Sequence, residues 1–111
     1  MMNEELKNLE VAVMAHKEGR LHDAENMYRA ILESNPLQAD ANHNLGLIAC
    51  AVGKPELSLP LFEVALKAYP THEQYLNSYI DALIAADEIS KAKKIILLNF
   101  KFLKFDKIHQ W

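Results

Sequence analysis

Five histidines and one cysteine are among the side chains of this chain that could hold a metal ion or attack a substrate. The histidines are His16, His22, His43, His72 and His109. No two of them are three or four positions apart, the spacing that places two metal ligands on one face of a helix. Cys50 is alone, which excludes an internal disulfide and a two-cysteine metal site.

The remaining signals for catalysis are also weak. Cys50 has no neighbouring base in the sequence, so we expect it to be a small, buried apolar side chain. His16 and His43 are expected to be solvated. No glycine-rich phosphate loop occurs, which leaves nucleotide binding without support. The chain is therefore expected to be no enzyme and to bind no metal and no cofactor.

Length and charge restrict the remaining classes. The 111 residues suffice for one domain, and the low glycine and proline content favours helices. Residues 1–90 contain 14 acids and 6 Lys/Arg, whereas residues 91–111 contain 6 lysines and one acid, Asp106. An acidic body repels phosphate, so nucleic-acid binding is not expected. The apolar run at residues 95–98 is too short to span a membrane, and a soluble, cytoplasmic protein is expected.

The sequence repeats itself with a period of 34 residues, which is the strongest pattern in the chain. The repeated columns are Gly19, Gly53 and Asp87; Pro36 and Pro70; Tyr28, Phe62 and Ile96; and Val11, Leu45 and Tyr79. The first column predicts three left-handed turns that end helices, and the prolines end the helices that follow. Each unit is thus expected to be a hairpin of two helices.

These helix-ending glycine, aspartate and proline positions predict six helices. They are expected near residues 4–17, 21–34, 38–52, 55–69, 72–86 and 88–104. Thr71 to Gln74 reads as a capping box at the start of the fifth. Pro60 falls inside the fourth helix; we favour a tolerated proline over a helix that starts at Leu57 with Ser58 as its cap. Gly46 is expected to lie against Phe62.

Residues in the middle unit carry a resemblance to a known family. Asn44-Leu45-Gly46, Gly53, Phe62, Ala65 and Pro70 closely resemble the signature of tetratricopeptide repeats. The resemblance implies one all-α domain over residues 1–111, with repeats at about 5–38, 39–72 and 73–104. It implies a right-handed superhelix, an α-solenoid of six helices, followed by a short C-terminal cap or docking tail at 105–111.

The family's fold implies a concave groove lined by the first helix of each unit. Carried over by position, the groove residues are Leu9, Val13, His16, Asp40, His43, Asn44, Leu47, Gln74, Asn77, Ser78 and Asp81. Helical spacing agrees, because Asp40, His43 and Leu47 share one face, opposite a Leu45, Ile48 and Val52 stripe that is expected to face the core. Only Asn44 matches the family's carboxylate clamp or its asparagine ladder.

The C-terminal segment is unusually apolar. Residues 95–105 are expected to surround a helix with apolar groups on nearly every side, which requires a cover. The candidate docking or oligomer surface consists of Ile95, Leu98, Phe102, Phe105 and Trp111. Two alternatives stay open: residues 105–111 fold back over the last repeat, or the segment docks on another subunit or domain.

The expected function is a non-catalytic scaffold that binds a protein or peptide in the groove. One alternative comes from the third unit, because residues 75–84 resemble the closing repeat of bacterial modules that precede glycosyltransferase or sulfotransferase domains. The chain would then be an accessory module that positions a transferase substrate. The other alternative is a homodimer built through the C-terminal helix.

Overall fold

The structure, a computed structural model, describes residues 2–103, without the side chains of residues 2 and 3. Six α-helices and one short 3-10 helix make up this part of the chain, and it contains no strand. They are α1 (Met2–Lys17), α2 (Leu21–Ser34), α3 (Ala39–Ala51), α4 (Pro55–Ala68), α5 (Glu73–Ala85), α6 (Ile89–Leu98) and η1 (Phe100–Phe102). The expected all-helical class is confirmed.

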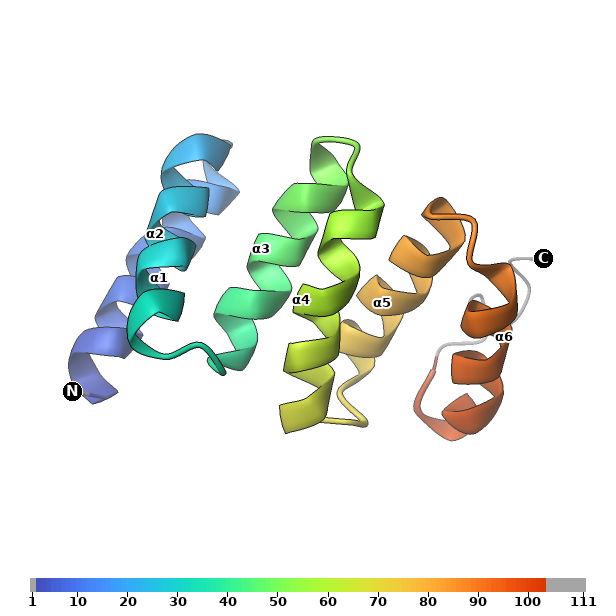
Figure 1. Ribbon diagram of the computed structural model, residues 1–111. Coiled ribbons are helices and arrows are strands. Elements are labelled where there is room, and N and C mark those ends of the chain that lie inside the picture. The colour runs from blue at the N-terminus through green and yellow to red at the C-terminus, as the bar shows by residue number, and fades with distance from the viewer. Residues whose placement is uncertain (1, 104–111) are drawn as a thin grey trace.

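Consecutive helices pack against one another from α1 to α6. Figure 1 shows them as three antiparallel pairs that follow one another across the molecule, with α1 and α2 at one end and α6 at the other. Short turns join the helices, which is why sequence neighbours are also neighbours in space.

The turn that ends the first helix of each pair has the same geometry three times. Gly19 and Gly53 have φ angles of +80° and +81°, and Asp87, one period later, has +62°. At the second turn, the Gly53 amide donates to the Cys50 carbonyl at 3.0 Å and the Lys54 amide to the Ala49 carbonyl at 2.9 Å. The same two bonds recur after α1 and after α5, so α1, α3 and α5 each end in a Schellman motif. The predicted left-handed column is confirmed.

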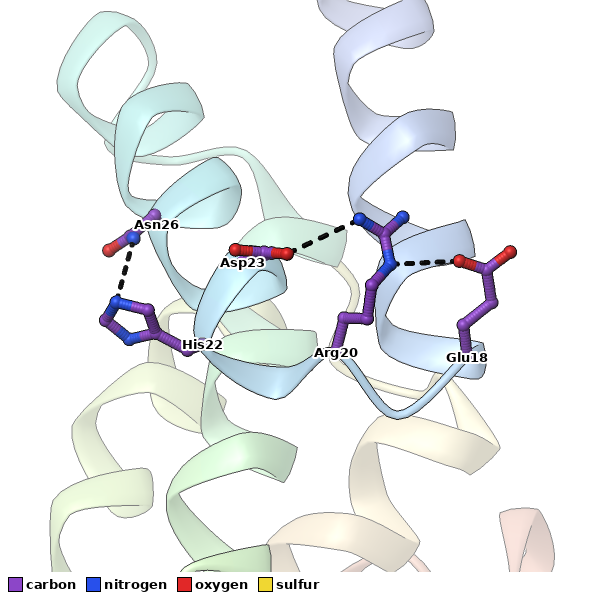
Figure 2. A network of polar contacts seen from close by, with 5 residues as sticks. All are labelled: Glu18, Arg20, His22, Asp23 and Asn26. Carbon is purple, nitrogen blue, oxygen red and sulfur yellow. Dashed lines mark hydrogen bonds and ion pairs between the residues drawn. The ribbon is translucent and has the colours of Figure 1, made fainter.

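Charged side chains bridge the first of these turns. The Arg20 guanidinium donates to Glu18 at 3.0 Å and to Asp23 at 3.4 Å, so one cation connects the end of α1 with the start of α2 (Figure 2). All three side chains are about half exposed, and such pairs contribute roughly 0–1 kcal/mol. The backbone motif at Gly19 therefore determines this turn more than the ion pairs do.

Side chains cap the helices that begin the second and third pairs. The Gln38 side chain accepts a hydrogen bond from the Ala41 amide at 2.7 Å, and His72, one period later, accepts one from the Tyr75 amide at 3.4 Å. The capping box predicted for Thr71 and Gln74 is wrong: the helix starts one residue later than a threonine cap requires, and an imidazole nitrogen takes the role of the hydroxyl.

Two further details of the helices test the sequence prediction. Pro60 lies within α4, which continues from Pro55 to Ala68, and the Ser58 hydroxyl donates to the Pro55 carbonyl at 2.6 Å instead of capping a helix. The tolerated proline is confirmed. The sixth helix was predicted to reach residue 104, but α6 ends at Leu98, where the Asn99 side chain donates back to the Ile95 carbonyl at 3.0 Å.

The core is divided into clusters that each join neighbouring helices. One surrounds Tyr28 and Leu45, and a second surrounds Phe62, Ile80 and Leu83. A Cβ on Gly46 would come within 2.5 Å of the Phe62 ring, so the predicted close approach of α3 and α4 is confirmed. The predicted core stripe was wrong for Val52, which is 56% exposed because it lies at the end of α3.

We predict that Gly53→Val lowers the free energy of unfolding by about 1–2 kcal/mol, because a β-branched residue is costly at positive φ. A Cβ there meets no atom within 4 Å, so the cost comes from the backbone alone. Thermal unfolding measures it. Gly53→Asp is the control and should lose less, since Asp87 adopts this conformation at the third turn. Equal losses in both variants would contradict this explanation.

We also predict that Gly46→Ala destabilises the protein, because overpacking costs about 1–3 kcal/mol whereas the gain in helix propensity is at most about 1 kcal/mol. The Phe62 side chain is fully buried, so it can move away only by displacing its neighbours. Gly46→Ala should cost less in a Phe62→Leu background, where the ring is absent. A double-mutant cycle in urea measures this coupling, and additive losses would exclude the contact as the cause.

Candidate functional site

Some residues of the faces predicted to line a groove on α3 and α5 contact one another in the structure. The His43 imidazole is within 2.8 Å of the Ser78 hydroxyl, and the Tyr75 hydroxyl donates to the Asp40 carboxylate. Both pairs connect residues 35 positions apart in the chain. Three of the predicted residues, Asp40, His43 and Ser78, are therefore part of one polar junction between the second and third hairpins.

His43 is the centre of this junction. Its side chain is only 2% exposed, so the expectation of a solvated histidine is wrong. It stacks on Tyr75 with ring centroids 4.6 Å apart and packs on Phe62 at 5.4 Å. Burial lowers the pKa of His43, and a hydrogen bond with Asn44 and the charge of Asp40 oppose this shift only partly. His43 is thus held in its neutral form, paired at both ring nitrogens.

Aromatic stacking extends the junction to the start of α5. Tyr75 lies between His43 and His72, and its centroid is 3.8 Å from that of His72 in a nearly parallel arrangement. Burial and the hydrogen bond to Asp40 raise the pKa of Tyr75. Neither Tyr75 nor His72 was among the groove residues predicted from the sequence. A buried tyrosine needs a partner for its hydroxyl, and Tyr75 falls at the start of a helix whose neighbour offers Asp40.

A second set of polar contacts joins the first hairpin to α3. The His16 imidazole lies 3.1 Å from the Tyr28 hydroxyl, and burial lowers the pKa of His16. Burial also raises the pKa of Tyr28, and a hydrogen bond with Asn44 opposes that shift. Because Asn44 also contacts His43 at 3.2 Å, polar contacts continue from α1 through α2 and α3 to α5. Tyr28, which was identified from the sequence only as a member of a repeated column, is a further member of this set.

The other predicted groove residues have different surroundings. Leu9 is buried in the first core cluster, while Val13 and Leu47 are half-buried against core clusters. Gln74 and Asp81 are exposed on α5. The Asn77 side-chain oxygen is buried without a hydrogen-bond partner. The predicted set therefore divides into core residues, junction residues and a few exposed polar groups.

The surface beside α1 is hollowed next to the predicted residues. A shallow hollow of about 360 Å³ is lined by Leu9, Glu10, Val13, Met14 and Lys17. Its apolar lining comes from the same helix face as the predicted groove positions of α1. This face therefore offers apolar contact, whereas the equivalent face of α5 offers polar groups.

The described residues offer little for metal or covalent chemistry. Cys50 is half-buried and packs against the second core cluster. Within residues 2–103, no three His, Cys, Asp or Glu side chains are close enough to hold one metal ion. Nor does this part of the chain contain a helix with the length and apolar character needed to cross a membrane.

The predicted docking surface near the C-terminus is only partly described. Ile95 and Phe102 are half-buried, and Leu98 is 70% exposed. Leu97 and Phe100, which were not in the predicted set, are exposed beside it. Phe105 and Trp111 lie outside the described residues.

Comparisons with known proteins leave the family open. No protein-family model matches the chain, and no curated protein is significantly similar to it.

Acidification should destabilise the protein through His43. The folded-state pKa of His43 lies below the unfolded value of about 6.5, so the unfolded chain binds the extra proton as the pH falls through that value. Stability is then lost below about pH 6.5, and His16 contributes in the same direction. Urea unfolding at pH 7.5 and 5.5 measures the loss. In His43→Gln, which lacks the titrating ring, the pH dependence should be smaller; an identical dependence would contradict this assignment.

Proposed function

We propose that this chain is a non-catalytic interaction module of the tetratricopeptide-repeat type. In this proposal the three hairpins form a right-handed superhelix, and α1, α3 and α5 line a groove that receives a peptide or a helix of a partner protein. The module acts in the cytoplasm and binds neither nucleic acid nor a membrane. The 34-residue period and the three equivalent left-handed turns support the repeat assignment.

The contact between α3 and α5 is the observation that carries the proposal. The hydrogen bond between His43 and Ser78 brings equivalent faces of two successive hairpins together. These faces carry residues at matching positions, because Asp40 and Gln74 are 34 residues apart, as are Leu47 and Asp81. A surface built from equivalent faces is continuous, and continuity is what an extended ligand requires.

The chemistry of this surface fits a polypeptide ligand. Asp40, Gln74 and Asp81 are exposed, so α3 and α5 present two carboxylates and an amide. An amide both donates and accepts hydrogen bonds, as a peptide backbone does, and carboxylates favour ligand cations. The hollow beside Leu9 and Val13 would accept an apolar side chain. The ligand that fits this surface is a peptide with backbone groups available for hydrogen bonds, one basic residue and one apolar residue.

Random peptides displayed on phage provide the test. Peptides that bind the full chain should lose affinity roughly 2- to 10-fold in Gln74→Ala, the value of one hydrogen bond of about 0.5–1.5 kcal/mol. Fluorescence polarisation with the selected peptide measures this affinity. The matched control is Asn26→Ala, which removes an exposed amide from α2 and should leave affinity unchanged. Peptides that respond to Asn26→Ala and not to Gln74→Ala would contradict the groove.

A further inference from the structure

The end of the molecule formed by α1 and α2 contains a hollow that the proposed groove does not use. Its volume is about 940 Å³, and we call it the head hollow. Its lining includes the apolar residues Val11, Met27, Ala30 and Ile31, and the acidic residues Glu4 and Glu5. Val11 is 51% exposed, which leaves apolar surface in contact with water. A hollow lined by apolar side chains and by two carboxylates, which we call its acidic rim, suits an apolar ligand that carries positive charge.

The rim of the head hollow is held in place by contacts within the hairpin. The Asn35 side chain, from the end of α2, donates to the Glu5 carboxylate at 3.0 Å. This bond joins the two helices across the hollow and orders one of its two carboxylates. The other, Glu4, lies in the first turn of α1, where the helix dipole stabilises negative charge. The negative charge of the rim is therefore a feature of the folded hairpin.

The opposite end of the molecule has the complementary character. Leu97, Leu98 and Phe100 are 76%, 70% and 57% exposed, and we call these three residues the tail surface. They lie at the end of α6 and the start of η1, at the far end from α1 and α2 (Figure 1). The exposed lysines Lys94 and Lys101 are close to them in the sequence. Three large apolar side chains that are mostly exposed lie within four consecutive residues here, and such a concentration is unusual for an isolated domain.

The two ends of the molecule also differ in charge. Residues 1–34 contain seven acidic residues and four Lys/Arg, whereas residues 91–103 contain four lysines and no acidic residue. Within one copy the two ends lie at opposite ends of the row of helices (Figure 1). Contact between them therefore requires two copies of the chain.

We propose that the chain self-associates head to tail, with the tail surface of one copy packed into the head hollow of another. The apolar side chains supply the contact, and the lysines beside them face the acidic rim. Because the two surfaces differ, each pair retains an unused head hollow and an unused tail surface. Association is then open-ended. This assembly differs from a symmetric dimer, in which both copies would use the same surface.

Two variants that each block one end test the proposal. Val11→Arg with Ala30→Arg fills the head hollow and adds positive charge, and Leu97→Gln with Leu98→Gln removes apolar groups from the tail surface. All four positions are exposed, and both replacements favour helix. Sedimentation velocity of the full chain should give sizes that increase with concentration for the wild type and the 12.6 kDa monomer for each blocked variant. An equimolar mixture of the two variants should form a pair of twice that mass and nothing larger.

A variant in the middle of the molecule is the control for this test. Leu57→Gln removes an exposed leucine from α4, away from both ends, and should associate as the wild type does. Circular dichroism confirms that each variant is folded. A wild type that stays monomeric at high micromolar concentration would overturn the proposal. So would a head-blocked variant that dimerises alone, because that result requires contact between two tail surfaces.

Discussion

The left-handed residue after α1, α3 and α5 is the constraint on which the rest of the structure depends. Gly19, Gly53 and Asp87 take positive φ where the chain reverses, and the two backbone bonds of each Schellman motif hold the turn in one conformation. The short turn forces the following helix to pack antiparallel on the one before. The turn at Gly53 aligns α3 with α4, and this alignment brings Gly46 close to Phe62.

Polar side chains, and not apolar ones alone, determine how successive hairpins meet. Burying His43 costs hydration, and the cost is offset because both ring nitrogens have partners, Asn44 and Ser78. An apolar contact tolerates sliding, whereas a hydrogen bond between α3 and α5 has one correct alignment. His43, Tyr75 and Asp40 thus specify the relative position of two hairpins whose exposed faces form the proposed binding surface.

The sequence predicted the six helices and most of their ends because helix ends are encoded locally. Glycine at 53 and proline at 70 act on their own backbone, so their effects do not depend on distant residues. The candidate site was less predictable, since the state of His43 depends on Ser78 and Tyr75, which lie a full period away. The end of α6 was missed for a different reason: the signal is local, since the Asn99 side chain bonds to the Ile95 carbonyl, but the prediction followed the apolar run that continues past Asn99.

The division of the core into clusters has a consequence for how the protein folds and opens. Each cluster gathers residues from helices that are adjacent in the sequence, so the loops that must close before contacts form are short. Chains with such local contacts fold quickly. The same locality means that a hairpin at one end can open while the middle stays intact. Amide hydrogen exchange would then be slowest around Phe62 and Tyr75 and faster toward α1 and α6, a gradient of protection along the chain.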